Sequence, residues 1–180
     1  SRIVFSNYPR NETLTNFPVL LVLGTNIPGF SYDDFLTADG GDLRVLADDG
    51  VTPLNFEVEQ WNPSDRSFVW VQIPHFTNHC AIRARWGDPD VTGAPVSAAN
   101  GATWSNGFIG VWHLAETNGP HLDRSPNLAT ARVTQVTTQG AATGIAGGAD
   151  HFNGTNDYVS LPDMGANARV TVECWVKLND

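Results

Sequence analysis

The chain has 180 residues, of which 41% are hydrophobic, so it is long enough to bury the core of one domain or somewhat more. Ten Lys and Arg stand against nineteen Asp and Glu, which gives a formal net charge of −9 and a pI near 4.8. Such an acidic surface repels the phosphates of nucleic acids and of anionic membranes. The longest apolar run, residues 17–23, is far shorter than the ~20 residues that a membrane-spanning helix needs. We therefore expect no nucleic-acid partner and no direct membrane insertion.

Apolar and polar residues alternate along most of the chain, which is the period of β-strands. The clearest cases are 80–86 and 170–177. Further strands are expected at 2–6, 17–23, 43–47, 55–61, 67–73, 108–114 and 158–161. Because Phe68–Val71 is apolar on both faces, the strand that contains it is expected in the centre of a sheet.

Short turn signals separate these runs, and only one segment resembles a helix. Asp-Gly and Asn-Gly dipeptides supply the positive φ that tight turns need. Ser31–Leu36 is expected to form one short helical turn, with Ser31 as its N-cap and acidic residues in its N-terminal half. The sequence thus predicts an all-β fold of antiparallel sheets.

Two stretches interrupt the alternation. Residues 93–107 lie in a region rich in Gly, Ala, Ser and Pro, and this composition predicts a linker between domains at 1–92 and 108–180. Residues 129–148 are rich in Thr, Ala and Gly, and they indicate either a strand pair with a long loop or a mobile segment. Cys80 and Cys174 alternate with apolar neighbours, which favours two small core residues, although a disulfide between the halves stays open.

Two known families share motifs with this sequence. The first ninety residues resemble DUF2341, a family of bacterial and archaeal extracellular modules, and 108–180 resembles the N-terminal part of a laminin-G-like, concanavalin A-like jelly roll, as also found in pentraxins. The segments that carry the first resemblance are Leu14–Leu20, Gly41–Arg44, Pro53–Trp61, Val69–Pro74 and Trp86–Pro89, and those that carry the second are Gly110–Leu114, Asp123–Asn127 and Phe152–Lys177.

These resemblances imply a β-sandwich followed by an incomplete jelly roll. The later strands of a jelly roll are absent from the sequence, so a missing C-terminal segment or a neighbouring chain is expected to complete the sheet. The alternating run 170–177 would otherwise be an exposed, adhesive edge. The resemblances also imply a location outside the cell, on its surface or in the periplasm.

Two polar clusters contain residue types that bind metals. His113, Glu116, His121 and Asp123 lie within eleven residues, but their spacing fits no helix-based metal motif, so a structural role is favoured. The second cluster has only oxygen ligands, which suit Ca²⁺, and related jelly rolls often hold structural calcium. Its candidate ligands are Asp150, Asn156 and Asp157, with Asn153 beside them; the alternative is a polar turn that bonds its own backbone.

No pattern in the sequence predicts catalysis. Glu57 and Glu59 share one face of a strand, as residues on any solvated sheet face do, rather than facing each other across a cleft. No G-x-S-x-G motif is present, and neither Cys lies in a catalytic signature. We therefore expect a protein that is not an enzyme.

Tryptophan offers the binding chemistry, because exposed indole rings stack on the apolar faces of sugars. Of the six tryptophans, Trp70, Trp86 and Trp112 lie in strands whose alternation predicts burial. The candidates for a carbohydrate site are Trp61, Trp104 and Trp175. The alternative is that Trp61 and Trp175 cover an interface between the modules.

The expected function is that of a non-catalytic extracellular module for carbohydrate recognition or cell-surface adhesion, whose partner is a glycan or a surface protein. A first alternative is a structural subunit of a surface filament, or the ectodomain of a proton-channel-type envelope assembly. A second alternative is an accessory part of a polysaccharide-degrading enzyme.

Overall fold

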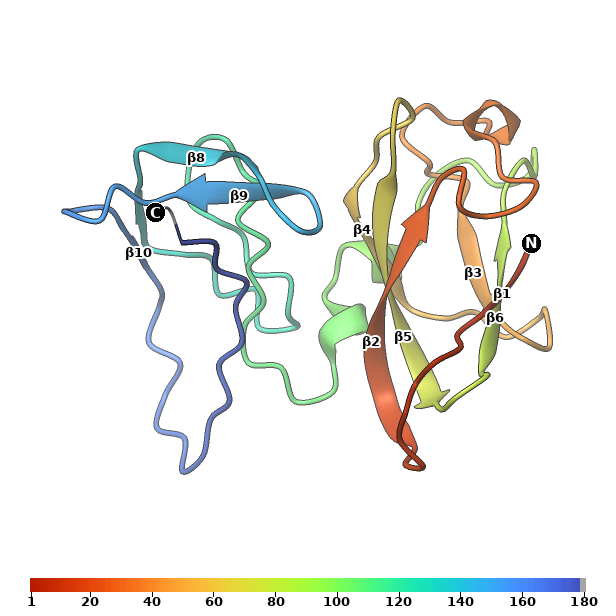
Figure 1. Cartoon of the computed structure of the whole chain (residues 1–180), viewed down its shortest axis with the longest axis horizontal. Helices are drawn as coiled ribbons and strands as arrows, with labels where there is room; N and C mark the ends of the chain where they lie inside the picture. Colours follow the sequence, from red (N-terminus) through yellow and green to blue (C-terminus); the bar gives the residue numbers. More distant parts are fainter. Residues whose placement is uncertain (179–180) are drawn as a thin grey trace. The chain divides into compact units, whose positions relative to one another are not determined.

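The computed structural model describes residues 1–178, and it confirms the all-β prediction: every strand pair is antiparallel. Figure 1 shows the course of the chain. Two compact units are present. Unit 1 consists of residues 1–111 and 124–128, and unit 2 consists of 112–123 and 129–178.

Unit 1 contains two three-stranded sheets, as expected for a β-sandwich. One sheet has the order β2 (Leu14–Leu23), β5 (Ser67–Phe76), β4 (Phe56–Gln60), and the other has the order β1 (Arg2–Val4), β6 (Ala81–Arg85), β3 (Arg44–Ala47). The expected central position of Phe68–Val71 is confirmed, because β5 lies between β2 and β4. Alternate residues of both sheets, such as Leu23, Val69 and Ile82, form one buried core.

Three short 3₁₀ helices accompany the sheets of unit 1: η1 (Tyr32–Asp34), η2 (Val96–Ala98) and η3 (Ala102–Trp104). The predicted helical turn is confirmed at η1, where the Ser31 hydroxyl accepts a hydrogen bond from the Asp33 N–H. Residues 93–107, expected as a linker, lie within unit 1 and carry η2 and η3. The sequence did not predict these helices because short 3₁₀ turns rich in Ala and Ser have no apolar period of their own.

Unit 2 contains two pairs of short strands. β7 (Val133–Gln135) pairs with β10 (Tyr158–Ser160), and β8 (Thr138–Thr143) pairs with β9 (Gly148–His151). Of the two alternatives for 129–148, the structure therefore shows strands. The strand expected at 108–114 is not formed; in its place Trp112 makes an isolated bridge with Asp123, since the chain passes from unit 1 to unit 2 at residues 111–112.

The run 170–177, predicted as a strand, is in no strand of the described chain. Its backbone has no ladder partner there, and a strand needs one to exist. The side chains of Val170, Val172, Trp175 and Val176 are 63%, 82%, 83% and 71% exposed. The prediction of a strand at 170–177 is therefore wrong for the described chain. The apolar side chains of this run lie open to solvent.

Two further findings concern the described residues as a set. None of their helices has the length and hydropathy to cross a bilayer. Cys80 is half-buried and Cys174 is exposed, and neither forms a disulfide.

Candidate functional site

The structure places the three candidate tryptophans in different surroundings. Trp104 is only 5% exposed, and its indole N–H donates to Glu57 Oε2 at 2.6 Å. Trp61 is half-buried and packs edge-on against Phe35, with ring centroids 4.8 Å apart. Trp175 belongs to unit 2 and is 83% exposed. Of the three, therefore, Trp175 alone presents a largely open indole face.

Another tryptophan, Trp86, lies at a surface hollow of unit 1. It directly follows β6, is half-buried, and stacks on Phe35 with centroids 5.3 Å apart and an interplanar angle of 11°. The alternation of β6 placed it in the core, because it falls on the same face as Ile82 and Ala84. The strand ends at Arg85, however, and the indole reaches the surface beyond that end.

We call this feature the β3–β6 hollow; its volume is about 330 Å³. Its lining includes Arg44 and Leu46 from β3, Val51 from the following turn, Arg85 from β6, and Trp86 and Asp88 beyond β6. A neighbouring hollow of about 350 Å³ shares Arg85, Trp86 and Asp88. Trp86 thus borders two adjoining depressions, an arrangement that suits an elongated ligand.

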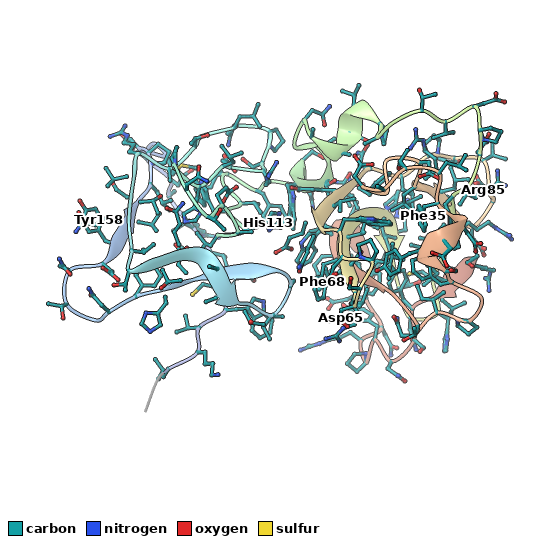
Figure 2. All side chains as sticks on the ribbon, turned by 90° about the horizontal axis from the view of Figure 1, so that it is seen from above. Phe35, Asp65, Phe68, Arg85, His113 and Tyr158 are labelled. Carbon is teal, nitrogen blue, oxygen red and sulfur yellow. The ribbon has the colours of Figure 1, made fainter. Side chains whose placement is uncertain are left out.

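The strand register accounts for the residues of the β3–β6 hollow. Arg44 lies directly opposite Arg85 on the neighbouring strand, and the next pair along the two strands, Val45 and Ala84, points into the core. Because side chains alternate across a sheet, both arginines project from the outer face. Figure 2 shows Arg85 at the margin of unit 1. Gly50 has a φ of +73°, and a Cβ there would come within 3.3 Å of Arg85 Nη2, so glycine keeps this side of the hollow open.

Asp42 fixes the wall of the hollow. This carboxylate is 1% exposed and accepts hydrogen bonds from Leu36 N, Gly87 N and both the N–H and the hydroxyl of Thr37, at 2.8 to 3.1 Å. Burial by itself would raise the pKa of Asp42, but these donors outweigh it and lower the pKa to about 2. The ionised side chain therefore ties the 36–37 turn to the segment that follows Trp86.

The residues expected to bind calcium belong to separate hydrogen-bond networks. Asp157 Oδ2 accepts from the N–H and hydroxyl of Thr137 and from Asn153 N, and the Asn156 side chain accepts from Asn153 Nδ2. Burial would raise the pKa of Asp157, but these hydrogen bonds lower it. Asp150 instead bonds to His121 and to Gly140 N. Within residues 1–178 no group of three or more His, Cys, Asp or Glu is arranged to hold a metal ion, and we derive no function through calcium.

Two residues of the other proposed metal cluster, Glu116 and His121, form a hydrogen-bonded group with Asp150. His121 is fully buried; its Nδ1 lies 2.8 Å from Glu116 Oε2 and its Nε2 lies 2.8 Å from Asp150 Oδ2. Each ring nitrogen of His121 thus has one carboxylate oxygen as its hydrogen-bond partner. Burial tends to raise the pKa of Glu116, but the hydrogen bonds from His121 and from the backbone N–H groups of Glu116 and Leu122 together outweigh it, and the pKa is lowered.

The Glu116–His121–Asp150 group ties separate segments of unit 2 together. Asp150 Oδ1 also accepts from Gly140 N, which joins β8 to β9, and Glu116 Oε1 accepts from Leu122 N. The group therefore connects residues 116–122 to the β8–β9 hairpin. The two ring nitrogens of His121 bond to Glu116 and Asp150 rather than to His113 or Asp123, the other members of the expected cluster; Asp123 Oδ2 accepts from Ala129 N.

The sequence signal for the hollow was weak. Arg44 and Arg85 each lie on the polar face of an alternating strand, which is typical of ordinary surface residues. Their proximity depends on the pairing of β3 with β6, across some forty residues of chain. Asp42 and Trp86 were both part of the quoted family motifs, but nothing in the motifs showed that they border one site.

Comparison with known proteins gives no relative from which to transfer a function: no family model, no curated protein and no solved structure matches the chain. The resemblances to DUF2341 and to laminin-G-like domains stay predictions.

Proposed function

We propose that this chain is a non-catalytic binding module that recognises carbohydrate, or adheres to a glycosylated surface, outside the cell. The observation that carries the proposal is the β3–β6 hollow with Trp86 at its edge. Sugars present apolar C–H faces that pack on indole rings, and their hydroxyls bond to charged side chains. Trp86, Val51 and Leu46 supply the apolar part, and Arg44, Arg85 and Asp88 supply the polar part.

The scaffold supports this function because the hollow is held by fixed elements. Trp86 is stacked on Phe35, and Asp42 holds the turns around it with four hydrogen bonds. A preformed site loses little conformational entropy when it binds a ligand. The extracellular, cell-surface or periplasmic location is part of the same proposal and rests on the family resemblance.

The test is a glycan-array screen of the whole chain, followed by affinity measurement for the best ligand. Trp86→Ala is expected to weaken binding by about tenfold or more, since each aromatic contact of this kind is worth on the order of 1 kcal/mol or more. Val51→Asn tests the hollow without disturbing the core, because Val51 is 79% exposed. Its matched control is Val96→Asn, at a valine that is 80% exposed and lies outside the hollow.

The outcomes separate the candidate sites. Loss of binding in the Trp86 and Val51 variants with retention in Val96→Asn supports the hollow. Retention in those variants with loss in Trp175→Ala would place the glycan site on unit 2 instead. No binding to any glycan would count against the whole proposal.

A second candidate function, assembly of a surface structure, is favoured by the open apolar run of unit 2. Val172 and Trp175 are more than four-fifths exposed, and the segment that carries them has unpaired backbone in the described chain. Such a segment can add a strand to the sheet of a neighbouring chain.

A further inference from the structure

Two pairs of arginines oppose each other across the strands of one sheet. Arg2 on β1 is opposite Arg83 on β6, and Arg44 on β3 is opposite Arg85 on β6. Like charges directly opposite each other destabilise a sheet. An acidic protein with a net charge of −9 has many carboxylates with which to neutralise such pairs.

The first pair is neutralised from within. The Arg2 guanidinium donates two hydrogen bonds, of 2.7 and 2.8 Å, to the Asp48 carboxylate. Arg83 Nε donates to the Asp48 carbonyl and lies 3.6 Å from the same carboxylate. The hydrogen bond from Arg2 and the nearby charges of Arg2 and Arg83 lower the pKa of Asp48. One carboxylate thus bridges two guanidinium groups on this face.

The second pair has no such bridge. Arg44 donates to the carbonyls of Gly41, Leu43 and Gly93, which fix the guanidinium group but carry no net charge. Among the described residues, no carboxylate lies within ion-pair distance of Arg44 or Arg85.

The carboxylates that border the β3–β6 hollow are already hydrogen-bonded within the protein. Asp42 is buried and accepts four hydrogen bonds from its own turns, and Asp88 Oδ1 accepts from Asp90 N. The Arg85 side chain is exposed and donates no hydrogen bond within residues 1–178. The hollow is therefore lined by a fixed guanidinium group and a free one, from residues opposite each other in the sheet, and by an indole.

We propose that the β3–β6 hollow is specific for an acidic sugar, whose carboxylate or sulfate group bridges Arg44 and Arg85 as Asp48 bridges Arg2 and Arg83. Guanidinium groups bind such planar or tetrahedral anions through paired, charge-assisted hydrogen bonds. Trp86 and Val51 then meet the apolar face of the sugar ring. This inference rests on the proposed function and names its ligand class.

The experiment measures binding of the whole chain to matched polymers. Dextran and dextran sulfate differ only in sulfate esters, and polygalacturonate and its methyl ester differ only in free carboxylates. We expect tighter binding to the charged member of at least one pair, with affinity that falls as salt rises. The pair that shows the difference identifies the anion as sulfate or carboxylate.

The key variant is Arg85→Gln, since this side chain makes no internal hydrogen bond whose loss would disturb the fold. It should weaken binding to the acidic polymer by about tenfold, as expected for one charge-assisted contact, and weaken binding to the neutral polymer by a clearly smaller factor, since a glutamine can still bond a sugar hydroxyl. Arg10→Gln is the matched control: it removes the same charge from unit 1 at an exposed residue outside the hollow.

The outcomes distinguish this inference from the function on which it rests. Equal binding to neutral and acidic polymers, or an Arg85→Gln variant that binds like Arg10→Gln, would overturn the acidic specificity and leave the carbohydrate function standing. Binding to no polysaccharide would overturn both. Binding to polyglutamate with the same dependence on Arg85 would overturn the sugar ligand, because the site would then accept an acidic protein.

Discussion

At the scale of single residues, a buried carboxylate with several hydrogen-bond donors holds loops of unit 1 together. Asp42 shows the principle most clearly, since a carboxylate that is 1% exposed would be very unfavourable without its four donors. Its donors come from residues 36–37 and from Gly87, which lie far apart in the sequence. A buried carboxylate here therefore joins residues 36–37 to the segment 86–88, which borders the β3–β6 hollow.

We predict that Asp42→Asn destabilises the protein by about 2 kcal/mol at neutral pH, because an amide has one acceptor oxygen and places N–H groups against N–H donors. The folded-state pKa of Asp42 is depressed to about 2, so its contribution is present above the unfolded pKa of about 4 and is lost as the pH falls toward 2. The difference in unfolding free energy between wild type and variant should shrink over that interval.

Urea unfolding at a series of pH values measures this difference. Asp33→Asn is the control, since Asp33 is an exposed acid in η1. A difference between wild type and Asp42→Asn that stays constant down to pH 2 would contradict the role assigned to the carboxylate.

At the scale of elements, the sequence predicted strands well wherever one face is buried against a core. Val45, Ile82 and Ala84 are at most 1% exposed, and their alternation with polar neighbours is the signal that located β3 and β6. The same signal failed at 108–114, because the chain there leaves one unit for another. Alternation reports which face would be buried, and it does not report whether a partner strand is present.

The β3–β6 hollow illustrates the same limit for the candidate site. Indole chemistry was sought in tryptophans outside regular alternation, but Trp104 is buried and bonded to Glu57, whereas Trp86, at the hollow, follows the alternation of β6. The residues that do border a hollow, Arg44, Arg85 and Trp86, are brought together by strand register. Register depends on long-range pairing, which a single sequence does not display.

The open run 170–178 gives a prediction at this scale. Apolar residues on an unpaired extended segment favour strand pairing between molecules, whereas lysine on such an edge opposes it. We expect the chain to self-associate with rising concentration, and the double variant Val172→Lys with Val176→Lys to shift it toward the monomer.

Light scattering at several concentrations follows this change directly. The control is Leu36→Lys with Val96→Lys, which places two lysines at apolar side chains of unit 1 that are 58% and 80% exposed. A wild-type chain that is monomeric at every concentration would rule out assembly through this segment.

At the scale of the whole molecule, unit 1 is discontinuous in sequence. After leaving it at Val111 the chain returns at residues 124–128. Arg124 N donates to the Val111 carbonyl at 2.7 Å, and Asn127 Nδ2 donates to the Ile109 carbonyl at 2.9 Å. Gly101, with a φ of +78°, lets this returning segment approach, because a Cβ there would lie 2.5 Å from the carbonyl carbon of Ser125.

The returning segment is also joined to the core sheet by charge. Arg124 Nε lies 3.4 Å from Glu57 Oε1, and Glu57 on β4 is only 5% exposed. Removing Arg124 would take an ion-pair partner from the buried Glu57 carboxylate and leave its charge less well compensated. Residues 124–128 are therefore part of the folding unit although they follow an excursion of twelve residues, 112–123, into unit 2.

We predict that a fragment of residues 1–128 is more stable than fragments ending at 111 or at 123. The loss of two hydrogen bonds and one ion-pair partner is worth about 2 kcal/mol or more, which in a domain of this size lowers Tm by roughly 8 °C. Circular dichroism melts of the three fragments measure this difference in Tm.

The fragment 1–123 is the control for length, since it contains the excursion without the return. If 1–123 melted together with 1–128, the contribution of Arg124 and Asn127 to unit 1 would be disproved, whereas a Tm close to that of 1–111 would show that the return itself stabilises the sandwich.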